Sequence, residues 1–358
     1  MNSWNESPTG KKRARGAGVP FQGIPGTNNS ITDVAGVQVG YTTLIEGDAV
    51  RTGVTAILPR PLDKLSTPVF AGYHSLNGNG ELTGTIWMDE AGRCDGPITI
   101  TNTHSCGVAR DASIKWMVEK MGKLGQWALP VAGETFDGYL NEINGFHVKE
   151  EHVMAALNAA AGGPIEEGSV GGGTGMICYG YKGGSGTASR LVDTAGIPVT
   201  VGVFVQANFG KRDQLTIAGI PVGRILNDPS DEDESGSIIG IVATDAPLLP
   251  HQLKRLARRV SLGIGRSGAV SGHGSGDIFM AFSTANEDAH HDEKRLASAE
   301  FVPNSRLDRI FQAVIQAVDE AIMNSIFSNE TMQGFDGSVV EGLPVEEVMS
   351  LLKEYRAL

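Results

Sequence analysis

From about Gly23 onward, the sequence alternates short apolar runs with longer stretches whose apolar residues recur at helical spacing. The short runs are rich in β-branched and aromatic residues and predict strands at Val37–Thr42, Val54–Leu58, Ile98–Thr103, Met176–Tyr181, Ile197–Val205, Ile238–Ala243 and Asp277–Phe282. The longer stretches predict helices at Ala109–Met121, His251–Leu262 and Leu307–Ile326. This mixture predicts a layered α/β architecture. No fixed-period repeat or internal linker divides residues 23–358, so we expect a single domain there.

Composition excludes several classes of partner. The formal net charge of −12 argues against nucleic acid and anionic membranes. No apolar run approaches the length needed to span a bilayer. The three cysteines, Cys94, Cys106 and Cys178, are too few and too widely spaced for a disulfide framework, and they indicate a reducing, cytoplasmic environment. The 48 glycines are clustered rather than periodic, which favours many tight turns in an ordered fold.

Two polar segments are predicted to lie outside the packed body. Residues 1–22 lack the apolar core of a secretory signal and carry a basic cluster, so we expect a flexible tail rather than a targeting or nucleic-acid patch. The stretch Ala285–Asn304 is rich in charged residues and histidines, and it is predicted to be a surface loop of variable length.

The segment Ser271–Ser283 contains a serine, Ser275, between two glycines at the start of a predicted strand. The pattern is not the G-x-S-x-G elbow of α/β-hydrolases, because Gly274 adjoins the serine and a strand follows it. On these residues alone, a tight turn entering a strand is favoured over a catalytic serine.

Other fragments occur together with this one: Asn102–Asp111, Pro130–Tyr139, Gly171–Gly180, Lys182–Arg190, Val205–Gly210 and the junction Gly274–Asp277. In this order, and over a span from about residue 23 to the C-terminus, they resemble the DmpA/BapA family. That family comprises self-processing serine aminopeptidases, namely L-aminopeptidase/D-Ala-esterase/amidases and β-aminopeptidases.

The resemblance implies a four-layer αββα sandwich like that of N-terminal-nucleophile hydrolases. It further implies that the precursor cuts itself between Gly274 and Ser275, that Ser275 becomes the nucleophile, and that processed heterodimers form a homo-oligomer, a tetramer in the family. A freed α-amine has a pKa of about 7.7–8.0 and can act as the general base. No metal or other cofactor is then required.

The resemblance assigns roles to five further residues. Asn208 matches an oxyanion-hole amide, and Glu134 matches the carboxylate that binds the substrate's amine. Tyr139 matches an active-site tyrosine, and Ser328 with Glu330 matches a Ser-x-Glu pair that assists the nucleophile. Each assignment leaves a structural alternative open. Asn208 could cap a loop, Glu134 could be a solvated acid, and Tyr139 could be a half-buried structural tyrosine. Ser328 and Glu330 could be exposed polar residues at the end of a helix.

Competing sites are less specific. The triplet His104-Ser105-Cys106 is expected to be a structural turn rather than a cysteine-protease site. His147 and His152 miss the spacing of H-E-x-x-H, and the pair His290-His291 lies in a charged loop, so we expect no metal.

Two other functions remain as alternatives. The Gly-rich stretch from Gly168 to Gly186 could bind a nucleotide, but it lacks Gly-Lys-Ser/Thr and a suitably placed downstream acid. Acyl transfer, as in ornithine acetyltransferases, normally uses Thr at the new N-terminus, so Ser275 favours hydrolysis. The sequence leaves the substrate open among L-α-, β- and D-aminoacyl groups, and between amide and ester.

Overall fold

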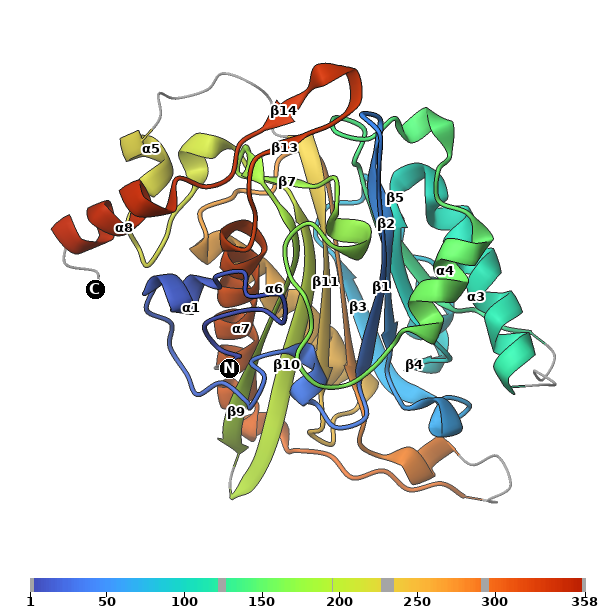
Figure 1. Cartoon of the computed structure of the whole chain (residues 1–358). Helices are drawn as coiled ribbons and strands as arrows, with labels where there is room; N and C mark the ends of the chain where they lie inside the picture. Colours follow the sequence, from blue (N-terminus) through green and yellow to red (C-terminus); the bar gives the residue numbers. More distant parts are fainter. Residues whose placement is uncertain (1–2, 122–126, 195, 227–234, 291–295, 356–358) are drawn as a thin grey trace.

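Four layers of secondary structure are visible edge-on in Figure 1. The structure is a computed structural model, and it describes residues 3–121, 127–194, 196–226, 235–290 and 296–355. Helices α3 (Cys106–Met121) and α4 (Glu150–Asn158) cover one sheet, and α6 (Pro250–Arg266) and α7 (Asp308–Phe327) cover the other. The predicted αββα sandwich is therefore confirmed. The three predicted helices are present, with no end shifted by more than four residues.

The sheet beneath α3 and α4 has four strands in the order β1-β2-β5-β6, with bounds Gln38–Glu46, Val50–Leu58, Ile98–Asn102 and Val131–Thr135. The other sheet has six strands in the order β4-β3-β12-β11-β10-β9, with bounds Arg93–Cys94, Val69–Ser75, Gly274–Ser283, Ser235–Thr244, Ile197–Asn208 and Gly184–Thr194. Within this larger sheet β11 and β12 run parallel to one another, and the other neighbours are antiparallel.

Successive side chains of the central strands point to opposite faces of the sheet, so the buried apolar residues form one layer on each face. In β11, Ile239 and Ile241 pack between the two sheets. Their neighbours Ile238 and Val242 pack on the opposite face with α6 and α7. The same alternation fixes which side chains near the strand ends face the space between the sheets, and this decides the composition of the site.

Some elements differ from the sequence-based prediction. The expected strand Met176–Tyr181 is a small hairpin, β7 (Ile177–Cys178) and β8 (Tyr181–Lys182), because Tyr179 and Gly180 adopt φ angles of +53° and +67° that reverse the chain. The prediction missed β3, β6 and β9; the first seven residues of β9 (184–190) are buried, but the glycines and serines among them give no apolar run. It also missed α2 (Thr85–Ala91), α4, α5 (Val222–Leu226), α8 (Val345–Glu354), β13 (Met332–Gln333) and β14 (Val339–Val340).

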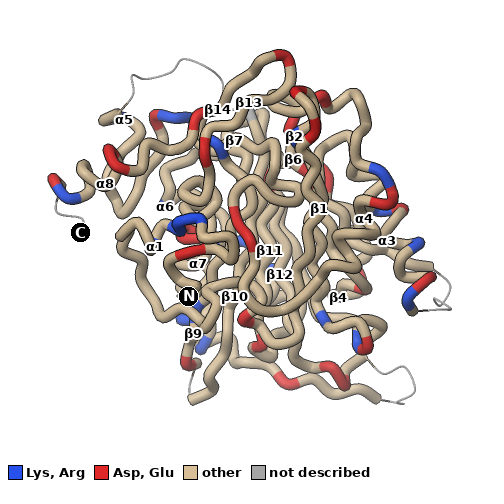
Figure 2. The backbone as a smooth tube through the Cα atoms, in the orientation of Figure 1, with Lys and Arg blue, Asp and Glu red and all other residues tan. Residues whose placement is uncertain are grey.

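The N-terminal segment does not meet the expectation of a flexible tail over residues 3–22. It contains α1 (Ala14–Ala17), and the Arg13 side chain is only 2% exposed. Arg13 pairs with the buried Glu167 at 2.6 Å, and Arg15 pairs with the buried Glu320 at 2.6 Å. Basic and acidic segments accordingly meet beside α7 in Figure 2. The basic cluster is ordered because carboxylates of the body neutralise it.

The predicted loop Ala285–Asn304 lies at the surface where it is described, with short 3-10 turns at Glu287–His290 and Asn304–Arg306. His291, Asp292 and Glu293 lie outside the described residues. Within the described ranges, no helix combines the length and hydropathy needed to cross a bilayer.

Candidate active site

Three residues of the six-stranded sheet are aligned across adjacent strands at the end where β10 stops and β11 and β12 begin. Asn208 of β10 is the register partner of Ser237 in β11, and Ser237 is the partner of Gly276 in β12. Cross-strand partners point to the same face of a sheet. Both Asn208 and Ser237 therefore lie on the face toward the four-stranded sheet, the face that Ile239 also occupies.

Ser237 is 5% exposed and its hydroxyl lies beside the peptide bond that precedes it. Its Oγ donates to the carbonyl oxygen of Gly236 at 2.7 Å and accepts the backbone N–H of Gly276 at 3.2 Å. Gly236 has φ +148°, and a Cβ there would lie 2.1 Å from the carbonyl oxygen of Asn208. Only glycine fits this position. The Ser237 hydroxyl therefore lies next to a peptide bond whose preceding residue is a tightly packed glycine.

Ser275 lies on the other face of the same sheet. In β12, Phe279 and Ala281 pack with the helices α6 and α7, and Ser275 and Asp277 share their parity along the strand. Ser275 is fully buried, and its Oγ donates to Oδ1 of Asp277 at 2.6 Å. The structure therefore places Ser275 in a side-chain pair rather than beside Asn208.

The Ser275–Asp277 pair nevertheless adjoins the backbone of Ser237. Asp277 is 1% exposed, and its carboxylate accepts the backbone N–H of Ile238 in addition to the hydroxyl of Ser275. Ser275 is the register partner of Gly236. Burial raises the pKa of Asp277, and the hydrogen bonds that it accepts oppose this shift. The pair consequently flanks the peptide between residues 236 and 237.

A loop from β3 holds this region in place. Nδ2 of Asn77 donates to the carbonyls of Ser271 and Gly272 at 2.8 and 3.1 Å and to Oδ2 of Asp277 at 3.2 Å. Nδ2 of Asn79 donates to the carbonyl of Gly274 at 2.8 Å. These two amides fix the turn that leads into β12.

Glu134 lies at the end of β6 in the facing sheet and is 2% exposed. Its Oε1 accepts the backbone N–H of Glu81 at 2.9 Å. A Cβ on Gly80 would lie 3.0 Å from that carboxylate and 3.4 Å from Cα of Gly276, so the backbone of Gly80 alone separates Glu134 from β12. Burial raises the pKa of Glu134, and hydrogen bonds from Thr103 and from the backbone of Glu81 oppose this shift, as does the nearby His104. Glu134 is therefore brought to the same end of the sandwich as Ser237.

The Asn208 amide is oriented by two backbone groups. Oδ1 accepts the N–H of Ile177 at 2.8 Å, and Nδ2 donates to the carbonyl of Phe136 at 3.0 Å. A primary amide carries two N–H donors, so one hydrogen of Nδ2 is available beside Ser237.

Ser328 and Glu330 are not brought to this site. Ser328 is buried, and its hydroxyl donates to the carbonyl of Lys12 at 3.4 Å, next to the edge strand β9; Glu330 is exposed. Because β9 is three strands from β12, about 14 Å at ordinary strand spacing, this Ser-x-Glu pair does not contact Ser275. Tyr139 is 53% exposed, in the loop that follows β6.

Sequence reasoning missed Ser237 and Asp277. Two signals were available for them: the Gly-Ser step at Gly236 directly before an apolar β-type run, and the Ser-x-acid spacing of Ser275 and Asp277. The predicted Ser-x-Glu pattern is thus matched in chemistry by Ser275-Gly-Asp277, at a different place from Ser328-Asn-Glu330.

The competing sites have structural roles. Cys106 is buried beneath the four-stranded sheet, and burial raises its pKa to about 12, so it carries no thiolate at neutral pH. In the Gly-rich stretch, a Cβ on Gly172 would lie 2.1 Å from Oε1 of Gln206, so its glycines allow close packing between the sheets. No cluster of three or more His, Cys, Asp or Glu suited to a metal occurs in the described part of the chain.

The chain is similar to known proteins over nearly its whole length. Residues 29–340 match the model of peptidase family S58. The β-peptidyl aminopeptidase BapA of Sphingosinicella microcystinivorans is 50% identical over 97% of this chain and 93% of its own. The L-aminopeptidase D-Ala-esterase/amidase of Ochrobactrum anthropi superposes with a TM-score of 0.92 at 47% identity, covering 97% of this chain and 99% of that one. A Burkholderia β-aminopeptidase gives a TM-score of 0.89 at 45% identity, covering 96% and 98%.

The protein is thus a serine hydrolase with a fold of the N-terminal-nucleophile type. It belongs to peptidase family S58, and it is a serine aminopeptidase of that family. The comparisons do not favour the acyltransferase or nucleotide-binding alternatives.

Proposed function

We propose that the chain is a self-processing aminopeptidase whose nucleophile is Ser237, in place of the Ser275 expected from sequence. The observation that carries this proposal is the alignment of Asn208, Ser237 and Gly276 on one face of the sheet. The hydrogen bond between the Ser237 hydroxyl and the carbonyl of Gly236 supports it, because it brings Oγ next to the bond that would break.

In this mechanism, Oγ of Ser237 attacks the carbonyl carbon of Gly236, and the C–N bond to Ser237 breaks. The hydroxyl proton passes to the departing nitrogen, and an ester joins Gly236 to Ser237. Water then hydrolyses the ester and leaves a carboxylate on Gly236 and a free α-amine on Ser237. That amine is the general base for later turnovers, since a serine hydroxyl is a weak nucleophile until its proton is removed.

Neighbouring residues supply the remaining functions. Ser275 and Asp277 flank the position where the amine is released and are suited to orient it. The free N–H of Asn208 stabilises the developing oxyanion, a contribution of about 3–4 kcal/mol for such a donor. Glu134 binds the ammonium group of the substrate, which restricts the enzyme to substrates with a free N-terminus.

The turnover that follows is acyl transfer to water. The aminoacyl group forms an ester with Ser237, the amine product leaves with the proton, and water releases the amino acid. The names of the relatives, β-peptidyl aminopeptidase and L-aminopeptidase D-Ala-esterase/amidase, support N-terminal aminoacyl amides and short peptides as substrates, including β-aminoacyl groups. Rates on β-alanyl and L-alanyl p-nitroanilides test this choice directly.

One measurement distinguishes Ser237 from Ser275 as the nucleophile. Intact-mass analysis and N-terminal sequencing of the purified protein should find a C-terminal chain spanning residues 237–358 and beginning Ser-Ile-Ile-Gly. A chain that begins Ser-Gly-Asp-Ile, at residue 275, would return the nucleophile to Ser275. An uncut, fully active protein would exclude self-processing altogether.

We also propose a cytoplasmic location and assembly into a homo-oligomer, as in the tetramers of the family, with neither nucleic acid nor membrane as a partner. The three free, buried cysteines support a reducing compartment, and the net charge of −12 disfavours anionic partners. Exposed Ile86 and Trp127, 86% and 59% accessible, support a contact between copies. Light scattering behind a sizing column measures the oligomeric state.

A further inference from the structure

A lysine that the proposed mechanism does not use is buried beside the site. Lys182 ends the short strand β8 and is fully inaccessible to solvent. Its Nζ donates to the carbonyl of Met176 at 2.8 Å and to the carbonyl of Gly183 at 2.7 Å. None of the carboxylates in the described ranges lies within ion-pair distance of this amine. A buried lysine without a carboxylate partner is costly, so its position calls for a function.

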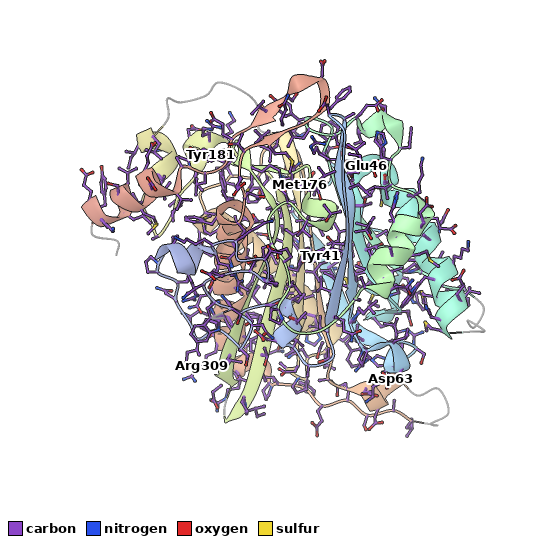
Figure 3. All side chains as sticks on the ribbon, in the orientation of Figure 1. Tyr41, Glu46, Asp63, Met176, Tyr181 and Arg309 are labelled. Atoms are coloured by element: carbon purple, nitrogen blue, oxygen red, sulfur yellow. The ribbon has the colours of Figure 1, made fainter. Side chains whose placement is uncertain are left out.

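The carbonyl of Met176 belongs to the same peptide group as the N–H of Ile177. That N–H donates to Oδ1 of Asn208 at 2.8 Å. One peptide therefore connects the two side chains: its oxygen accepts from Lys182 and, at 3.0 Å, from the backbone N–H of Gly183, and its nitrogen donates to Asn208. Met176, which directly precedes this hairpin, and Tyr181, in its second strand, are labelled in Figure 3 at the end of the molecule where β7 lies in Figure 1.

Hydrogen bonds arranged in series polarise one another. Donation from Lys182 to the peptide oxygen makes the Ile177 N–H a stronger donor, and that N–H draws electron density toward Oδ1 of Asn208. The Nδ2 hydrogens of Asn208 become stronger donors in turn. The same series fixes the orientation of the amide, because Oδ1 must face Ile177 and Nδ2 must then face Phe136 and Ser237.

We propose that Lys182 is a positioning residue for the oxyanion donor, acting on Asn208 through the Met176–Ile177 peptide. The inference rests on the proposed role of Asn208. Both protonation states of Lys182 can donate to the two carbonyls, so the orientation of the amide persists in each of them.

The test is a double-mutant cycle between Lys182→Met and Asn208→Ala, assayed on an aminoacyl p-nitroanilide. Rates are normalised to the cleaved fraction found by intact mass. Removing an oxyanion donor lowers kcat by about 10²–10³-fold, and Lys182→Met should lower kcat by about 10-fold with KM unchanged. In the Asn208→Ala background, Lys182→Met should have little further effect, because the two residues act through one series of bonds.

Arg212→Ala is the matched control. Its Nη2 donates to the carbonyl of Gly180 and its guanidinium lies 4.3 Å from the centre of the Tyr181 ring, so the substitution disturbs the turn of the same hairpin without removing a bond to the Met176–Ile177 peptide. It should keep a kcat near that of wild type. If Lys182→Met does not fold, Lys182→Gln replaces it in the cycle, because its amide can still donate to one carbonyl.

The outcomes separate the two proposals. If Asn208→Ala lowers kcat and Lys182→Met multiplies that loss independently, or has no effect alone, the inference is overturned while the proposed function stands. An equal loss of kcat in Arg212→Ala would also overturn it, since general loosening of the hairpin would then explain the effect. If Asn208→Ala leaves kcat unchanged, the oxyanion role itself fails.

Discussion

Asn208 and Ser237 are direct partners in adjacent antiparallel strands, with their side chains on the face between the two sheets. The strand that carries Ser237 is also paired on its other side with β12. A nucleophile at this position has a rigid amide donor on one flank and the Ser275–Asp277 pair on the other, so its geometry is set by the sheet rather than by a loop.

Replacing each serine in turn distinguishes their functions. Ser237→Ala should remain a single uncut chain without activity, since the attacking oxygen is gone. Ser275→Ala should still be cut before residue 237, more slowly than wild type, because only a neighbour of the reacting peptide is lost. Gel mobility and intact mass over a time course measure both. Normal cleavage of Ser237→Ala would contradict the assignment.

The amine-binding role of Glu134 predicts a change in selectivity. Glu134→Gln keeps the size of the side chain and loses its charge, so substrates with a free amine should bind with a higher KM. The preference for free over N-acetylated p-nitroanilides should shrink as a result. A variant that retains the full wild-type preference would remove Glu134 from the site.

The two Gly-Ser steps show which part of the site could be predicted from the sequence and which part could not. Both Gly236-Ser237 and Gly274-Ser275 precede an apolar β-type run, and a motif does not reveal which of the two faces Asn208. That distinction depends on the antiparallel register of β10 with β11 and the parallel register of β11 with β12, long-range pairings without a local signature. The helices α3, α6 and α7 and the layered α/β class were predictable because the periodicity of their apolar residues is local.

Two other sequence-based interpretations differ from the structure because they depend on contacts between residues that are distant in sequence. Ser328-Asn-Glu330 matches a pattern, but the fold carries it to the edge strand β9, away from β12. The basic N-terminal cluster resembled a solvated tail because its partners, Glu167 and Glu320, are distant in sequence. Burial and pairing of charges are tertiary properties, so composition alone misassigned them.

Asp277 gives a prediction about stability and pH. Burial raises its folded-state pKa above the unfolded value, so its contribution to stability is fully present below the unfolded pKa and is lost as pH rises through the folded pKa. Asp277→Asn removes this loss. The Tm of the variant relative to wild type should therefore increase between pH 4 and pH 7, although processing and activity fall.

Differential scanning calorimetry at the two pH values measures this difference. Asp111→Asn, at an exposed side chain of α3, is the matched control and should follow wild type at both. A relative Tm of Asp277→Asn that falls as pH rises would contradict the expected direction.

The N-terminal segment is expected to contribute to global stability. Arg13 pairs with Glu167, and its guanidinium also donates to the carbonyls of Asn29 and Thr187 at 2.8 Å each. Arg13→Ala leaves a buried carboxylate without its cation, which typically costs about 3–5 kcal/mol of unfolding free energy. Urea titration of Arg13→Ala should find such a loss. Arg309→Ala, at an exposed ion pair, should change little.

The strand order of the larger sheet has a consequence for a protein cut before Ser237. Strands β11 and β12 would then belong to the short chain, inserted between β3 and β10 of the long one. Two interleaved polypeptides cannot separate without dismantling the sheet, so they should co-purify through dilution. Once denatured, they would have to meet again by diffusion. Recovery of the mature enzyme should thus slow on dilution, whereas the uncut Ser237→Ala chain should regain its structure at a concentration-independent rate.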